Sequence, residues 1–272
     1  MTARHHPGPP ARLAFSTLGC PGLAVTDVAQ LAADNGFAAV ELRARSGEPV
    51  HAGLDAGQRR AVRAAFDRRG VGVLAIASYV KVADASTGDD EVVADAVAHA
   101  RLAGDLGAAF LRVFPGGPAD VPAASLDAIA ARRLRRIQRA LAGIPVTVAL
   151  ETHDSHPRAA DCVRILDRCP GVVAIWDALH PWRSGEPPTD TARLLGERIG
   201  YVQVKDVASR TDLIPLPPGD GVLPLADMAD ALRRIGYRGW VSWEYERAWF
   251  PELPALPELA GRVSARMREL FG

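Results

Sequence analysis

The chain has 272 residues, of which 48% are hydrophobic and 24% charged, as in an ordinary globular protein. Its 32 basic and 32 acidic residues cancel, so no basic field indicates binding to nucleic acid or to an anionic membrane surface. No apolar run reaches the roughly 18 residues of a membrane span. Residues 1–10 are polar and proline-rich, unlike a secretory signal.

The hydrophobic pattern predicts strands and helices that alternate eight times. Short runs rich in β-branched and aromatic residues predict strands at 13–18, 37–42, 71–77, 109–114, 145–151, 172–177, 201–206 and 240–244. Longer segments predict helices at 25–35, 55–69, 89–106, 123–141, 157–167, 189–198, 224–234 and 252–270. Eight such units in about 260 residues are typical of a (β/α)8 TIM barrel. A doubly wound sheet is the main rival, but no G-x-G-x-x-G follows the first run.

No linker divides the chain into two domains. We predict a disordered N-terminal tail at residues 1–11 and one catalytic barrel at residues 12–272. Three scattered cysteines, Cys20, Cys162 and Cys169, are typical of buried thiols in a reducing cytoplasm. A cytoplasmic location is therefore expected.

Oxygen-bearing side chains lie at or near the carboxyl ends of the last four predicted strands. Glu151, Asp177, Gln203 and Glu244 are separated by 26, 26 and 41 residues, which suits successive strand-plus-helix units. Because the carboxyl ends of barrel strands open onto one face, we expect these four side chains to converge. Three carboxylates and one amide oxygen suit Mn²⁺ or Mg²⁺, and Co²⁺ also fits. A divalent cation would relieve the repulsion among the carboxylates.

Further polar groups lie near these candidate ligands. His153 follows Glu151 by two residues and His180 follows Asp177 by three. Lys205 follows Gln203 by two, so both side chains point to the same side of the strand. The chain has 30 arginines and only two lysines, which draws attention to Lys205.

Candidate substrate-binding residues close the third and fourth strands. Tyr79 and Arg112 could bind a hydroxyl or a carboxylate, although a structural role for Tyr79 fits nearly as well. Trp182 belongs to a set of tryptophans that could wall the barrel mouth, and packing of the barrel explains that set almost equally well; the others are Trp176, Trp243 and Trp249.

Five motifs together resemble the xylose isomerase-like TIM-barrel superfamily, in the branch of sugar phosphate isomerases and epimerases. They are Leu150-Glu-Thr-His153, Trp176-Asp-x-x-His180, Val202-Gln-Val-Lys-Asp206, Gly219-Asp-Gly221 and Gly239-Trp-x-x-Trp-Glu244. The resemblance spans nearly the whole chain. It implies that Glu151, Asp177, position 203 and Glu244 bind the metal.

Position 203 departs from the pattern, because ketose 3-epimerases have histidine where this chain has Gln203. An amide oxygen still binds Mg²⁺ or Mn²⁺. The 3-dehydroshikimate dehydratases of the same superfamily tolerate such a ligand, and they are similar to this chain at positions that include His153, His180 and Lys205. A lyase is therefore a serious competitor.

The resemblance implies proton abstraction α to a carbonyl of a keto-sugar or related polyol, through an enediolate that the metal stabilises. In an isomerase or epimerase, Glu151 and Glu244 would move the proton. His180 and Lys205 would stabilise the substrate hydroxyls or the developing oxyanion. In a dehydratase of the 3-dehydroshikimate or inosose type, His153 would be the base and His180 or Lys205 the acid. The sequence leaves both open.

Two other classes rank lower. An apurinic endonuclease would need more histidines and a D-x-H triplet after the seventh strand, and this chain is neutral and has Gln203. A non-catalytic sugar-binding barrel is opposed by the intact acidic set. The expected partner is a small sugar or cyclic polyol, with no nucleic acid and no membrane.

Two features leave alternatives open. The backbone of Gly219-Asp-Gly221 could bind a phosphate, but Asp220 would oppose it, so a non-phosphorylated substrate is favoured. Trp249-Phe250-Pro251 could form a homo-oligomer contact or a lid.

Overall fold

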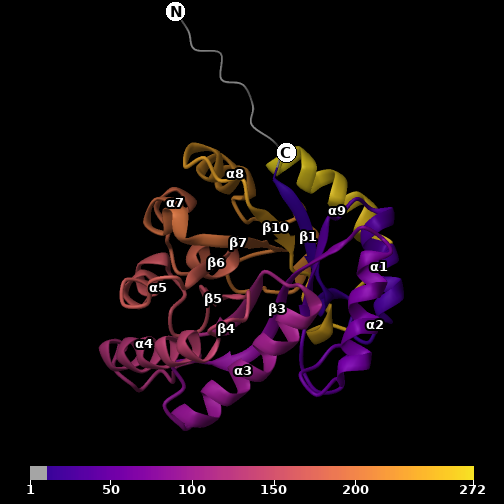
Figure 1. The fold of residues 1–272 in the computed structure, drawn as a ribbon. Coiled ribbons are helices and arrows are strands. Elements are labelled where there is room, and N and C mark those ends of the chain that lie inside the picture. Colours follow the sequence, from indigo (N-terminus) through magenta and orange to yellow (C-terminus); the bar gives the residue numbers. More distant parts are fainter. Residues whose placement is uncertain (1–10) are drawn as a thin grey trace, which may run out of the picture.

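The computed structural model describes residues 11–272, which form a closed barrel of parallel strands surrounded by helices (Figure 1). Following the barrel round from β1, the strands pair in the order β1-β2-β3-β4-β5-β6-β7-β10 and back to β1. Their bounds are β1 Arg12–Ser16, β2 Ala39–Arg43, β3 Gly72–Lys81, β4 Phe110–Phe114, β5 Thr147–Glu151, β6 Val173–Asp177, β7 Ile199–Val204 and β10 Trp240–Trp243. The predicted (β/α)8 TIM barrel is confirmed. The predicted tail lies, apart from Ala11, outside the described residues.

The helices follow the strands and pack around the barrel (Figure 1). Their bounds are α1 Val25–Asp34, α2 Ala56–Asp67, α3 Asp89–Leu106, α4 Ala123–Ala140, α5 Ala159–Leu166, α6 Leu179–Arg183, α7 Pro188–Leu195, α8 Leu225–Arg234 and α9 Leu256–Phe271. Helix α6 was not predicted, because it is a single short turn that contains Pro181. Among the helices of residues 11–272, none is both long and apolar enough to cross a bilayer.

Two apolar layers fill the barrel and its surroundings. A small inner cluster closes the lumen, and it contains Ala14, Ala39, Leu74, Ala75, Ala149, Ile175 and Tyr201. A large outer cluster lies between strands and helices, and it includes Trp176 and Trp243. Strand side chains alternate between the two layers, so the neighbours of inward-facing residues point outward. Of the two alternatives left open for Trp176 and Trp243, barrel packing is therefore the one that the structure supports.

Arginines of α4 bind acidic residues at the start of α3. The buried side chain of Arg133 donates to Asp89 at 2.8 Å and to the carbonyl of Asp84 at 2.7 Å. Arg132 also donates to Asp89, and this hydrogen bond is the largest of the causes that lower the pKa of Asp89. The arginine pattern of this helix thus serves to join α3 to α4.

Asp206 fastens the long loop between β7 and α8. It opens the two-residue strand β8 (Asp206–Val207), which pairs antiparallel with β9 (Pro215–Leu216). Its buried carboxylate accepts hydrogen bonds from the backbone N–H groups of Val207, Gly219, Gly221 and Leu223, at 2.9 to 3.0 Å. A Cβ at Gly221 would lie 2.3 Å from Asp206 Oδ1, so only glycine lets the loop approach this closely. The amides of Gly219 and Gly221 are therefore bound to a side chain of this protein, and the amide of Asp220 donates to the carbonyl of Pro217 at 3.0 Å.

Replacing Asp206 by alanine is expected to lower the free energy of unfolding by about 3 kcal/mol, because four backbone donors lose their acceptor. Urea denaturation measures this change. Asp220→Ala is the matched control, since Asp220 pairs with Arg262 at the surface and is expected to contribute less than about 1 kcal/mol. Equal losses in the two variants would contradict the assigned role of Asp206.

Candidate functional site

A layer of polar side chains lies directly above the inner apolar cluster. Glu151, Asp177 and Gln203 each follow an inward-facing residue of that cluster by two positions, after Ala149, Ile175 and Tyr201. Alternation along each strand therefore directs these three polar side chains into the lumen as well. Trp240, Ser242 and Glu244 continue the same pattern along β10. This pattern is what brings residues from distant parts of the sequence into one site.

Three of the four predicted metal ligands converge closely. Glu151, Asp177 and Glu244 each offer a carboxylate oxygen, and these oxygens all lie within 4.8 Å of one another. The three side chains are almost completely buried. Carboxylates so close in a buried site repel one another strongly unless cations lie between or beside them.

Arg112 and Lys205 supply positive charge to these carboxylates. Arg112 Nη1 lies 3.3 Å from Glu151 Oε2 and 3.6 Å from Glu244 Oε1. Its Nη2 donates to the carbonyl of Ser78 at 2.9 Å, which fixes the guanidinium. Lys205 Nζ lies 2.9 Å from Asp177 Oδ2 and also donates to Glu244 and Glu246. Both predicted cationic residues thus lie beside the predicted ligands.

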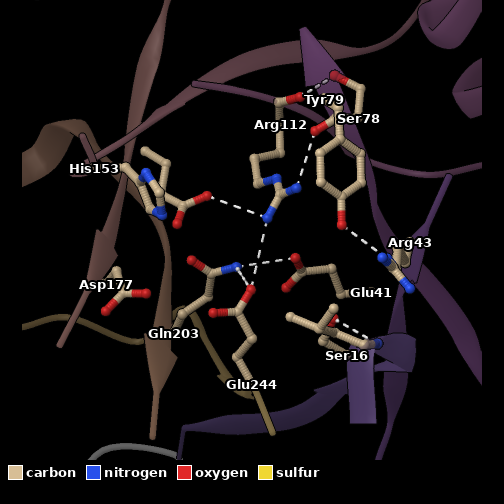
Figure 2. A network of polar contacts seen from close by, with 12 residues as sticks. Ser16, Glu41, Arg43, Ser78, Tyr79, Arg112, His153, Asp177, Gln203 and Glu244 are labelled. Carbon is tan, nitrogen blue, oxygen red and sulfur yellow. Dashed lines mark hydrogen bonds and ion pairs between the residues drawn. The ribbon is translucent and has the colours of Figure 1, made fainter. Parts of the chain in front are cut away.

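Gln203 lies between two glutamates (Figure 2). Its Nε2 donates to Glu41 Oε1 at 2.9 Å and to Glu244 Oε1 at 3.1 Å. Its Oε1 is buried and has no hydrogen-bond partner within residues 11–272. One oxygen each of Glu151 and Asp177 also lacks a hydrogen bond there. These oxygens of Glu151 and Asp177 each have a cation nearby, Arg112 and Lys205 respectively. Of the three oxygens, Gln203 Oε1 is therefore the one whose burial is left uncompensated within residues 11–272, and a divalent cation beside it would satisfy it.

Glu41 is a site residue that the sequence analysis missed. It lies on β2, two positions after the inward-facing Ala39, and its side chain is fully buried. Ser242 Oγ donates to its Oε2 at 3.2 Å. A carboxylate within a hydrophobic strand pattern was the signal that could have identified it. Glu246 was missed too, although it follows Glu244 by two positions and reaches Lys205.

The polar layer above the inner cluster contains more buried carboxyl groups than buried cationic side chains. Four buried carboxylates, those of Glu41, Glu151, Asp177 and Glu244, face two buried cations, Arg112 and Lys205. Burial and the charge of Glu244 raise the pKa of Glu41 to about 8. Burial raises the pKa of Glu151 to about 7, with Arg112 opposing the shift. A divalent cation would favour the ionised form of these carboxyl groups and compensate their charge, so the residues present fit one ion of that kind.

His153 and His180 form a pair beside the carboxylates. Their ring centroids lie 4.1 Å apart, and both can reach a common point with Glu151. Burial lowers the pKa of His180 well below its ordinary value, and the neighbouring His153 and Lys205 act in the same direction. In His153, burial lowers the pKa, but the ion pair with Asp154 (Nδ1 to Oδ1, 2.7 Å) and the charge of Glu151 outweigh it, so the pKa is raised. Two imidazoles with divergent pKa values suit an acid and a base.

Asp154 keeps the loop after β5 in an unusual conformation. Its φ of 45° makes it the one non-glycine residue with positive φ in residues 11–272. The backbones of His153 and His156 bridge across this turn. Residue 154 lies immediately after His153, so the turn determines where that imidazole is placed.

The predicted substrate-binding residues lie in different surroundings. The hydroxyl of Tyr79 accepts a hydrogen bond from Arg43 Nε at 2.7 Å, and the Tyr79 ring lies 5.6 Å from the guanidinium of Arg112 (Figure 2). Trp249 is half exposed and stacks 4.8 Å from the guanidinium of Arg43. Trp182 instead stacks on Arg210 at 4.4 Å and lines a small apolar cavity beside α7 and α8. Arg112 and Tyr79 therefore adjoin the carboxylate layer, whereas the contacts of Trp182 are made elsewhere.

Comparison with known proteins identifies similar barrels. The model of the "Xylose isomerase-like TIM barrel" family matches residues 29–270. A "Putative hydroxypyruvate isomerase" of Streptomyces coelicolor is 33% identical over 93 residues, which are 34% of this chain and 32% of that relative. The alignment thus spans about one third of either protein.

Two solved structures share the fold. The D-psicose 3-epimerase of Clostridium cellulolyticum, solved with D-tagatose, has a TM-score of 0.77 and 13% identity, over 95% of this chain and 98% of that one. The probable 3-DHS dehydratase of petrobactin synthesis from Bacillus anthracis has a TM-score of 0.78 and 19% identity, over 94% of this chain and 98% of that one. At these identities the likeness concerns the fold alone.

Proposed function

Because the chain belongs to the xylose isomerase-like TIM barrel family, we propose that it is a divalent-metal-dependent isomerase or epimerase of a keto-sugar or related polyol. The observation that carries this proposal is the convergence of three buried carboxylates. Gln203 contacts one of them, Glu244, and its own Oε1 has no hydrogen-bond partner within residues 11–272. Glu151, Asp177, Gln203 and Glu244 would hold the ion. Their all-oxygen donor set favours Mn²⁺ or Mg²⁺.

The bound ion would supply Lewis acidity at a substrate carbonyl, which lowers the pKa of the neighbouring C–H. Glu151 or Glu244 would then take up that proton and return it at another face or at the adjacent carbon. The ammonium of Lys205 and the guanidinium of Arg112 would donate to substrate oxygens as negative charge develops. Burial of all four groups would keep water away from the reacting carbon.

A dehydratase is the second candidate, and the His153–His180 pair favours it. The sequence analysis made His153 the base and His180 or Lys205 the acid, but the pKa shifts favour the reverse for the two imidazoles. A neutral His180 would remove the α-proton, and a protonated His153, or Lys205, would protonate the departing β-hydroxyl. The chain has both imidazoles beside Glu151, where an isomerase that uses two carboxylates does not require them. The fold shared with a 3-DHS dehydratase is compatible with this chemistry.

A non-phosphorylated substrate fits the site better than a sugar phosphate. The backbone amides of Gly219 and Gly221, which could have bound a phosphate, donate to Asp206 instead. One relative, which matches over about one third of its length, is named as a putative hydroxypyruvate isomerase. Hydroxypyruvate is therefore included among the substrates to be tested.

Incubation in D₂O with Mn²⁺ separates the two reactions. The substrates are ketoses, inososes, hydroxypyruvate and 3-dehydroshikimate, and NMR follows the products. Deuterium at the α-carbon of an isomeric product is expected for the proposed isomerase or epimerase. Loss of water to an enone or an aromatic product would establish the dehydratase instead. Absence of exchange with every compound would contradict both.

A further inference from the structure

We propose that Glu41 is a positioning residue that turns the amide of Gln203 so that its oxygen faces the metal site. The inference rests on the proposed metal site and extends it to a residue outside the ligand set. Its basis is the hydrogen-bond pattern around the amide (Figure 2).

An amide can be placed with either its oxygen or its nitrogen toward the centre. Here both hydrogen bonds of Nε2 go to glutamate oxygens, Glu41 Oε1 at 2.9 Å and Glu244 Oε1 at 3.1 Å. The opposite placement would set Gln203 Oε1 against those two oxygens, which repel it once both carboxylates are ionised, the state that a bound divalent cation favours. The acidic neighbours therefore select the orientation that leaves Oε1 free for a cation.

Of the two glutamates, Glu41 is the one that can keep this function once an ion is bound. Glu244 contributes an oxygen to the cluster of three carboxylates, so it would itself bind the ion. Glu41 belongs to neither cluster of potential ligands within residues 11–272. Ser242 Oγ donates to its other oxygen at 3.2 Å and so holds the carboxylate in place.

The Glu41 contact also strengthens Gln203 as a ligand. A neutral amide oxygen is a weaker donor to a cation than a carboxylate. Donating Nε2–H to a carboxylate shifts electron density toward Oε1, as a carboxylate does for a metal-binding histidine. Glu41 thus provides both the orientation and the polarisation that let an amide occupy the ligand position on β7.

The test is a double-mutant cycle on metal affinity, measured by calorimetric titration of the metal-free protein with Mn²⁺. Glu41→Met keeps the side-chain length and removes the acceptor, and it is expected to weaken Mn²⁺ binding about 10- to 100-fold. Glu41→Gln can still accept from Gln203 and donate to Ser242, so it should recover most of the affinity. Gln203→Met removes the ligand itself, and adding Glu41→Met to it should then change the affinity less than about threefold.

The outcomes distinguish this inference from the metal site. The fold-loss of Mn²⁺ affinity in the double variant could equal the product of the losses in the two single variants. That result would show that Glu41 does not act through Gln203 and would overturn the inference. Wild-type affinity in Glu41→Met would overturn it too, while the metal site would stand. A wild-type protein that binds no divalent ion would refute the proposed function and this inference together. If Glu41→Met does not fold, as thermal unfolding would show, Glu41→Leu, which also removes the acceptor, replaces it in the cycle. Coupling to Gln203→Met again supports the inference, and independence again overturns it.

Discussion

Glu151→Gln and Glu244→Gln are each expected to lower kcat/KM by at least about 10³-fold. Glutamine keeps the shape of the side chain, but it cannot accept the substrate proton. The change also removes one negative charge from the three carboxylates that would hold the ion. Steady-state kinetics on the substrate identified in D₂O measures the loss.

The matched control for this pair is Glu252→Gln. Glu252 is an exposed acid before α9, and its replacement should leave kcat/KM within about twofold of the wild type. Turnover that is unchanged in Glu151→Gln or in Glu244→Gln would remove that residue from the assigned site.

Lys205→Met is expected to lower turnover without weakening metal binding. The ammonium of Lys205 contacts Asp177 and Glu244, so in the metal-free protein it competes with a divalent ion for their oxygens. Its removal should therefore leave Mn²⁺ affinity unchanged or raise it. Turnover should fall by about 10²-fold or more, because a donor to the developing negative charge is lost.

Lysine occurs at only one other position, which provides the control. Lys81→Met changes an exposed lysine at the end of β3 and should affect turnover little. Calorimetry and kinetics on both variants test both expectations. A Lys205→Met protein that no longer binds metal would show that Lys205 stabilises the site structurally, against this prediction.

The sequence was informative where one local rule determined the structure. Helix α3 has the predicted bounds, because three acidic residues begin it and Gly107 ends it in a left-handed conformation. Glu151, Asp177 and Gln203 were predicted to converge because each lies at or near the end of a hydrophobic strand, and all parallel strands of a barrel end at one face. These inferences need no knowledge of contacts between distant residues.

The missed features depend on contacts between distant segments. Glu41 joins the site only because the closed barrel brings β2 opposite β7, 162 positions later in sequence. Asp206 likewise depends on a contact across the loop. Its carboxylate accepts hydrogen bonds from the amides of Gly219 and Gly221, which the sequence analysis considered as a phosphate-binding site. The contact between Trp182 of α6 and Arg210 of the loop after β7 is also one between distant segments, which the sequence analysis did not predict.

The metal content of the protein tests the central claim most directly. After loading with Mn²⁺ and dialysis, elemental analysis should find about one ion per chain in the wild type. Asp177→Asn, which removes one of the three clustered carboxylates, should retain much less. A wild type that holds no Mn²⁺, Mg²⁺, Co²⁺ or Zn²⁺, or an Asp177→Asn protein that holds as much as the wild type, would contradict the assignment of a metal site to these four residues.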